Sequence, residues 1–169
     1  MAVALRDAYY FNTGVNETRG VNDMRFNPAA ATRLRTPELS FMEFQASRYS
    51  TLTAGDVDGV IDYFRRREGN FYYFGECTIV YALTGRPSPS PYLWYHPGLT
   101  VPPPDSPRFA RVEDEAIRNL FRYNVRFFVV GDNAPPQEAF PRLWRHVADR
   151  VVGEERIGGI RILELAGGP

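Results

Sequence analysis

Apolar side chains in the second two-thirds of the chain either recur with helical spacing or form short unbroken runs. A helix over Gly55–Glu68 is predicted because apolar residues fall at i, i+3, i+4 and i+7, and Gly69 follows as a carboxyl cap. The run Phe71–Phe74 is apolar throughout, as expected of a strand buried on both faces. A short helix over Cys77–Leu83, stopping at Thr84–Gly85, comes next.

The same pattern continues to the end of the chain. Ser106–Pro107 predicts the start of a helix that runs to Arg122. Its expected inward residues are Val112, Ala116, Ile117, Leu120 and Phe121. The remaining predicted elements are a strand over Val125–Val130, a turn at Gly131–Asn133, a helix from Pro136 with Phe140, Leu143, Trp144, Val147 and Val151 on one face, and a hairpin of Glu155–Ile157 and Ile160–Leu165 around Gly158–Gly159.

Residues 1–52 lack this periodicity and are predicted to form an ordered N-terminal arm, with one short helix at Pro28–Arg35. Residues 53–166 are predicted to form a single α/β domain. Because helices alternate with apolar strands, we expect Rossmann-like layers with a small, mostly parallel sheet, flanking helices and a C-terminal β-hairpin.

Composition narrows the classes of function. The 169 residues carry 20 basic and 20 acidic side chains, so net charge does not favour nucleic acid or an anionic membrane surface. All the basic residues are arginine, which excludes a catalytic lysine or a P-loop lysine. The sequence has neither a run of about twenty apolar residues nor a signal peptide, so no membrane span is expected in this piece. No feature of the sequence predicts an oligomeric state.

The segment from Asn70 to Gly98 contains most of the candidate chemistry. A strand, Gly75 and a helix in succession are typical of the ligand crevice of open α/β sheets, where backbone N–H groups at the turn can bind an anion. An ordinary βα turn is the alternative. Glu76 favours that alternative over a phosphate site, and it suits a ligand that donates hydroxyl groups. No nucleotide-binding fingerprint is present, and no cofactor is expected.

The proline-rich loop after this helix presents Arg86, Tyr92, Trp94 and His96. Prolines hold a loop in one conformation at little entropic cost, aromatic faces stack on sugar rings, and arginine pairs with phosphate or carboxylate. The alternative is that Trp94 and Tyr92 fix the loop to the core. The length of the loop favours a ligand-binding surface.

Cys77 offers a second kind of site. A thiol at a helix N-terminus with His96 or His146 as its base would suit a small hydrolase, although a buried inert thiol is the commoner situation. With two histidines and no HxxxH or HxxE spacing, a metal site is not predicted.

The stretch FYYFGECTIVYALTGRPSPSPYLWYHPGLTVP, followed after one helix by NVRFFVV, resembles a known family. It is similar to the C-terminal soluble domain of bacterial integral-membrane glycosyltransferases related to the dolichyl-phosphate-mannose–protein mannosyltransferases. The similarity covers Thr53–Leu165 and rests on the TGRP turn and on the loop with Trp94 and Pro97–Gly98.

This resemblance implies an extracytoplasmic domain of a longer membrane protein that transfers a sugar from a polyprenyl-phosphate donor to an acceptor. The family's catalytic carboxylate lies between transmembrane helices absent from this chain, so no catalytic residue is carried over. Glu76, Arg86, Tyr92, Trp94 and His96 would then line a crevice that assists donor or acceptor binding. The alternatives are a free-standing binding module for a sugar or related metabolite and, less favoured, a hydrolase using Cys77 or Glu76.

Overall fold

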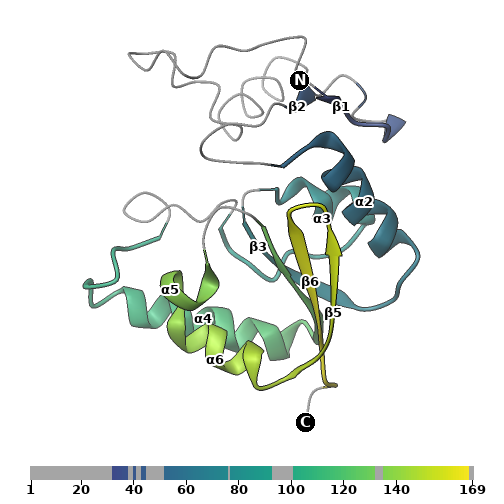
Figure 1. Cartoon of the computed structure of the whole chain (residues 1–169). Helices are drawn as coiled ribbons and strands as arrows, with labels where there is room; N and C mark the ends of the chain where they lie inside the picture. Colours follow the sequence, from purple (N-terminus) through teal and green to yellow (C-terminus); the bar gives the residue numbers. More distant parts are fainter. Residues whose placement is uncertain are drawn as a thin grey trace, which may run out of the picture.

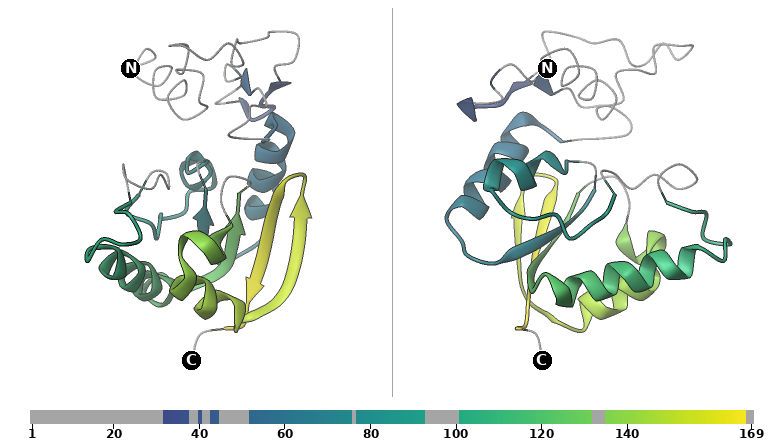
Figure 2. Two further views of the ribbon diagram at one scale, coloured as in Figure 1. Left: turned by 60° about the vertical axis from the view of Figure 1, so that its left-hand side comes forward. Right: turned by 180° about the vertical axis from the view of Figure 1, so that it is seen from behind.

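The computed structural model describes residues 32–37, 40, 43–44, 52–75, 77–92, 101–131 and 135–167. In these residues a four-stranded sheet lies between two layers of helices, and a small two-stranded sheet lies beside one layer (Figures 1 and 2). The elements, labelled as in Figure 1, are β1 (Thr32–Arg33), β2 (Glu43–Phe44), α2 (Ala54–Arg65), β3 (Asn70–Phe74), α3 (Ile79–Thr84), α4 (Phe109–Arg122), β4 (Val125–Val130), α5 (Pro136–Ala139), α6 (Pro141–Ala148), β5 (Val151–Ile157) and β6 (Ile160–Leu165).

The sheet has the strand order β3-β4-β6-β5, and only β3 and β4 run parallel. The α/β layer fold is therefore as expected, but the prediction of a mostly parallel sheet is wrong. The Gly158–Gly159 turn is too short for a crossover connection, so β5 and β6 must pair antiparallel. The hairpin then joins the sheet through β6, which pairs antiparallel with β4.

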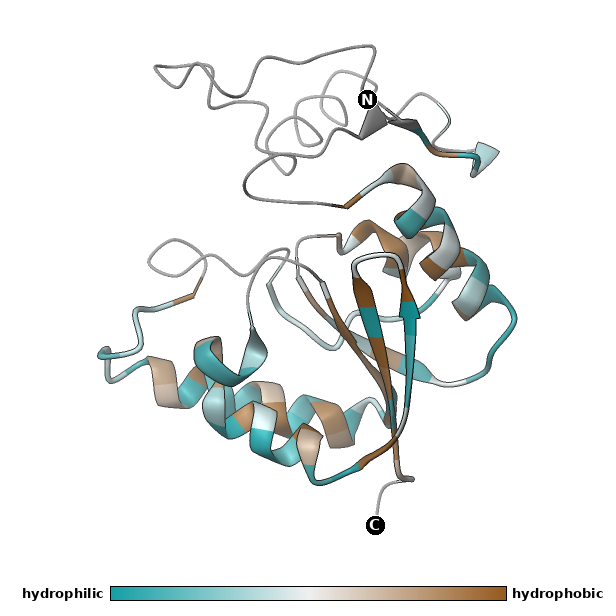
Figure 3. Cartoon of the chain, viewed as in Figure 1, coloured by the Kyte–Doolittle hydropathy of each residue, from teal (hydrophilic) through white to brown (hydrophobic). Residues whose placement is uncertain are grey.

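Two apolar clusters form the core, one on each face of the sheet. The first lies under α2 and α3, and the second lies under α4, α5 and α6 (Figure 2). Along β3, Phe71 and Tyr73 belong to the first cluster, whereas Tyr72 and Phe74 belong to the second. Alternate side chains of one strand therefore enter both clusters, which explains the unbroken apolar run and confirms that this strand is buried on both faces. Figure 3 shows mostly hydrophobic colouring along β4.

Several helix ends differ from the sequence prediction, and α3 spans Ile79–Thr84 rather than Cys77–Leu83. Helix α2 starts with a capping box between Thr53 and Asp56 and ends at Arg65, with Arg66 as its carboxyl cap. Gly69 lies beyond the cap, in the turn before β3, with a φ of 112°. At the start of α4, Ser106 Oγ accepts a hydrogen bond from the N–H of Arg108 at 3.2 Å, and the helix begins one residue later.

The long helix expected from Pro136 to Val151 is instead two short helices followed by a strand. Phe140 separates them, with φ −142° and ψ 71°. The cause is Pro141, because a proline ring disfavours the helical conformation of the residue before it. Val151 belongs to β5 rather than to the helix.

Helix α6 is capped from a different helix. The carboxylate of Glu113, buried on α4, accepts hydrogen bonds from the N–H groups of Arg142 at 2.8 Å and Leu143 at 3.4 Å. These N–H groups lie in the first turn of α6, where no partner exists within the helix. Glu113 therefore holds the two helices of this layer together.

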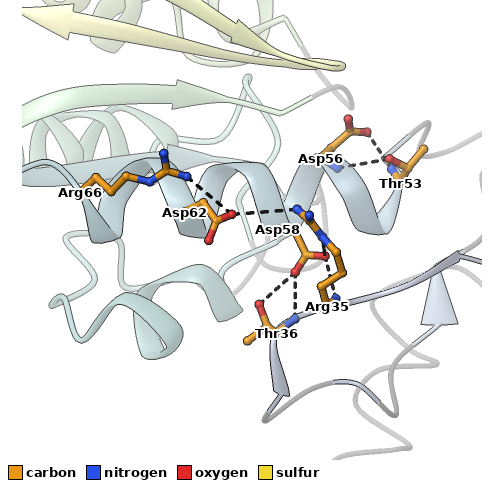
Figure 4. Close-up of polar contacts among 7 residues, drawn as sticks. All are labelled: Arg35, Thr36, Thr53, Asp56, Asp58, Asp62 and Arg66. Atoms are coloured by element: carbon orange, nitrogen blue, oxygen red, sulfur yellow. Dashed lines mark hydrogen bonds and ion pairs between the residues drawn. The ribbon is translucent and has the colours of Figure 1, made fainter.

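A buried carboxylate on α2 anchors the segment that contains β1 (Figure 4). Asp58 accepts hydrogen bonds from the N–H of Arg35 at 2.7 Å, the N–H of Thr36 at 3.2 Å and the Thr36 hydroxyl at 2.9 Å. The Arg35 Nε atom lies 3.4 Å from the same carboxylate. The helix predicted at Pro28–Arg35 is wrong where the structure describes it, because Thr32 and Arg33 form a strand paired with β2. Leu34 and Arg35 are not helical either, and residues 28–31 lie outside the described residues.

Helix α2 lies close to the hairpin of β5 and β6, and a substitution at Gly59 tests this contact. A Cβ atom on Gly59 would lie 2.6 Å from Cγ2 of Ile157, whereas a Cβ atom on Gly55 would meet only the Thr53 hydroxyl at 3.5 Å. We expect Gly59→Ala to lower the free energy of unfolding by about 1 to 3 kcal/mol, because it overpacks the contact. The matched change Gly55→Ala should leave it unchanged or raise it by up to about 1 kcal/mol. Urea unfolding of both variants measures the difference, and equal effects would contradict the contact.

Candidate functional site

The carboxyl ends of β3 and β4 form the part of the fold where a ligand site is expected. From β3 the chain continues into α3 on one face of the sheet, and from β4 it continues into α5 on the other face (Figures 1 and 2). In open α/β sheets, ligands bind outside the carboxyl ends of adjacent parallel strands whose connections leave toward opposite faces. Because β3 and β4 are the parallel pair of this sheet, that rule selects the positions directly after Phe74 and Val130.

A glycine occupies each of these two positions. The N–H of Gly131 donates to the carbonyl of Phe74 at 2.9 Å, which continues the pairing of the strands. A Cβ atom on Gly131 would lie 3.5 Å from the Cα of Gly75, and one on Gly75 would lie 2.7 Å from the ring of Tyr73. The two strand ends therefore meet backbone to backbone beside the Tyr73 side chain, and both glycines are buried.

Sequence reasoning selected Gly75 and missed Gly131. The signal was present, because Gly131 directly follows an apolar strand as Gly75 does, but it was interpreted only as the first residue of a turn. Helix α3 begins at Ile79, so Gly75 does not itself lie at a helix N-terminus. Anion binding by Gly75 stays a prediction.

Glu76, Trp94 and His96 lie outside the described residues. They belong to the chain segments that follow β3 and α3. Their roles in ligand binding stay predictions.

Arg86 is engaged in contacts with the protein itself. Its guanidinium donates to the carbonyl of Phe64 at 2.7 Å and to the carbonyl of Arg67, and it lies 5.8 Å from the centre of the Phe64 ring. Burial lowers the pKa of the Arg86 guanidinium, and the nearby carboxylate of Glu68 opposes that effect. These contacts place Arg86 at the end of α2, and they give it a structural role in satisfying carbonyls that the helix leaves unpaired.

Tyr92 lies on the other face of the sheet. It is half-buried against the second apolar cluster, and burial raises the pKa of its hydroxyl. The segment leading to it is held by Asn119 on α4, whose amide donates to the carbonyl of Pro89 at 2.8 Å. Because Arg86 contacts the first cluster and Tyr92 the second, the described contacts do not bring these two side chains together.

The candidate residues for a hydrolase are also separated. Cys77 is half-buried against the first cluster, whereas His146 is exposed on α6, in the opposite helical layer. His146 therefore cannot serve as the base for Cys77, and His96 lies outside the described residues. Within the described part of the chain, no group of three or more His, Cys, Asp or Glu side chains could hold a metal ion.

A shallow groove of about 540 Å³ lies at the other end of the sheet, beside the start of β4 and the end of β6. The Arg126 guanidinium and the Glu164 carboxylate form an ion pair of 2.9 Å along it. The sequence does not predict this groove, because its residues are far apart along the chain and only strand pairing brings them together. The residues that line the groove are Glu68, Gly69, Asn124, Val125, Arg126, Val152, Glu164, Leu165, Ala166 and Gly167.

Comparison with known proteins does not add a function to this geometry. No protein-family model matches the chain, and neither a curated protein nor a solved structure is similar to it. The functional argument therefore rests on the residues and the fold.

Proposed function

We propose that this chain is a non-catalytic binding domain that holds a sugar or a related polar ligand at the carboxyl ends of β3 and β4. The observation that carries the proposal is the pair of adjacent parallel strands that end at Gly75 and Gly131, with connections leaving toward opposite faces of the sheet. Glu76 directly follows Gly75 in the sequence, and a carboxylate there suits a ligand that donates hydroxyl groups.

The narrower form of the proposal is that the domain serves a membrane glycosyltransferase with a polyprenyl-phosphate sugar donor. It rests on the resemblance of Thr53–Leu165 to the soluble domains of such enzymes. In that role the domain assists donor or acceptor binding at the extracytoplasmic face of the membrane, through a membrane portion outside this sequence. Of the helices that the structure describes, none has the length and apolar character needed to cross a bilayer.

Nuclear magnetic resonance tests the binding site directly. The ¹⁵N-labelled chain is titrated with methyl α-mannoside, mannose 1-phosphate and a short water-soluble polyprenyl phosphate. We expect the amide signals of Gly75 and Gly131 to shift in proportion to ligand added, because the ligand would lie against these strand ends. The amide of Gly153, on the far strand β5, is the internal control and should not move. Shifts confined to β5, or none with any ligand, would reject the site.

The same titration separates the two forms of the proposal. Binding of the sugars without the polyprenyl phosphate supports a free-standing binding module and rejects the glycosyltransferase role. The Trp94→Ala variant should weaken binding while changing the free energy of unfolding by about 1 kcal/mol or less, as for a residue outside the core. A loss of 3 to 5 kcal/mol, roughly the cost of removing a buried aromatic residue, would place Trp94 in the core instead. Incubated alone with a polyprenyl-phosphate sugar, the chain should transfer no sugar.

A further inference from the structure

Strand β5 is one of the two edge strands of the four-stranded sheet, and β3 is the other. It pairs with β6 on one side, and no described element lies along its other side (Figure 2, left). The backbone groups on that side therefore have no strand partner within the described residues. Such an edge is a template for another strand, unless its side chains prevent pairing.

The geometry of the hairpin decides which residues present these backbone groups. Ile157 and Ile160 flank the two-residue turn Gly158–Gly159. Residues that flank a turn of this length exchange hydrogen bonds, and hydrogen-bonded and non-hydrogen-bonded pairs then alternate along the ladder. Ile157 and Glu155 therefore direct their backbone groups toward β6, whereas Glu154 and Arg156 direct theirs outward.

Two copies of β5 can pair antiparallel in only a few registers, because outward-facing residues must lie opposite one another. Glu154 opposite Glu154 would place two carboxylates together, and Arg156 opposite Arg156 would place two guanidinium groups together. Glu154 opposite Arg156 places unlike charges together. Two-fold symmetry repeats that pair on the other side of the axis.

We infer that β5 pairs antiparallel with β5 of a second copy of this chain, with Glu154 of each copy opposite Arg156 of the other. Each of these pairs exchanges both of its backbone hydrogen bonds. The two sheets then continue through the dimer axis, and the β5 edge of each copy is covered.

The side chains on the edge fit this register. The Glu154 carboxylate accepts two hydrogen bonds of 3.0 Å from Arg161 of its own chain. Arg156 contacts the same carboxylate at 3.2 Å and remains 69% exposed, so it can turn to the opposite copy. Val152, which is 66% exposed, lies at an irregularity of β5 between Val151 and Gly153, so the regular pairing is confined to residues 154–157.

One contact opposes the pairing. Glu155 lies on the symmetry axis and faces Glu155 of the second copy, and like charges directly opposite are unfavourable. Its charge is offset within its own chain, because Arg67 on the neighbouring helix lies 2.6 Å from the carboxylate. Since a single pair of edge strands buries less surface than a standard interface, the dimer is expected to be weak and to depend on concentration.

Sedimentation velocity between about 10 µM and 1 mM, the range of a weak interface, tests the inference. We expect the dimer fraction of the unaltered chain to rise across this range. The variants Arg156→Glu and Glu154→Arg place like charges opposite one another, so each alone should self-associate at least tenfold more weakly. An equimolar mixture of the two restores unlike pairs at both positions and should form a heterodimer. The control Arg111→Glu, an exposed charge reversal on α4, should dimerise as the unaltered chain does.

A chain that stays monomeric throughout, a dimer that persists in both single variants, or a mixture that fails to associate would each overturn the inference. Hydrogen exchange provides a check without substitutions. The amides of Glu154 and Arg156 should exchange at least tenfold more slowly at the highest concentration than at the lowest. Unchanged exchange at these two amides would also overturn it.

Discussion

Replacing Phe71 by alanine is expected to lower the free energy of unfolding by about 3 to 5 kcal/mol. The Phe71 ring is fully buried on β3 and lies between two other rings, with its centre 4.1 Å from that of Phe64 and 4.6 Å from that of Tyr81. Alanine would leave a cavity between α2, α3 and the sheet, because the stacked rings on either side belong to different helices and cannot both move into it. Urea unfolding followed by circular dichroism measures the change.

The matched control is Phe121→Ala. The sequence pattern predicted an inward Phe121 on α4, but its side chain is 43% exposed. The guanidinium of Arg150 lies over its ring, 5.2 Å from the ring centre. We expect a loss of about 1 kcal/mol or less, as for surface positions. If Phe71→Ala lowers the free energy of unfolding as little as Phe121→Ala does, the layer of α2 and α3 contributes less to stability than its packing indicates.

Replacing Asp58 by alanine is expected to lower the free energy of unfolding by about 2 to 4 kcal/mol, since hydrogen bonds to a buried charged group are worth more than neutral ones. The N–H and hydroxyl groups of Thr36 and the N–H of Arg35 would lose their acceptor together. The segment around Leu34, whose side chain is buried in the first cluster, would be released from α2. Urea unfolding measures the loss, and faster amide exchange at Arg35 and Thr36 would show where it arises.

Asp62→Asn on the same helix is the control. Among the described residues, the Asp62 carboxylate makes only long contacts with Arg35, at 3.9 Å, and with Arg66, at 3.8 Å, and both arginine side chains are largely exposed (Figure 4). Exposed ion pairs of this kind contribute about 0 to 1 kcal/mol. If Asp62→Asn lowers the free energy of unfolding as much as Asp58→Ala does, the negative charge on α2 accounts for both losses, and the hydrogen bonds from Arg35 and Thr36 to Asp58 do not.

The contribution of Asp58 should also depend on pH. Burial raises the pKa of the Asp58 carboxyl, but the hydrogen bonds from Arg35 and Thr36 outweigh burial, so the pKa lies below its ordinary value of 3.8. A lowered folded-state pKa gives a stabilisation that is fully present above the unfolded-state pKa and is lost as the pH falls through the folded-state pKa. The difference in stability between the unaltered chain and Asp58→Ala should therefore be constant near neutral pH and shrink only below about pH 4.

The amino-acid sequence by itself determined the elements of the core. The apolar run Phe71–Phe74, and the run Val125–Val130 that only Arg126 interrupts, are typical of core strands, and both are strands of the sheet. The Gly158–Gly159 turn fixed the C-terminal hairpin, since two residues can join only antiparallel strands. The spacing of apolar residues likewise fixed the buried face of α2. Each of these features follows from interactions between residues close in the sequence.

Only the tertiary structure decided how these elements combine. Whether β6 pairs parallel or antiparallel with β4 depends on which edge of the hairpin meets the sheet, and no local pattern encodes that choice. Asp58 and Glu113 follow the helical pattern of exposed polar residues, yet both are buried, because backbone N–H groups from distant segments use their carboxylates as acceptors. For the same reason the sequence identified Gly75 but not its partner Gly131. The candidate site consists of two strand ends that are far apart along the chain, and only strand pairing brings them together.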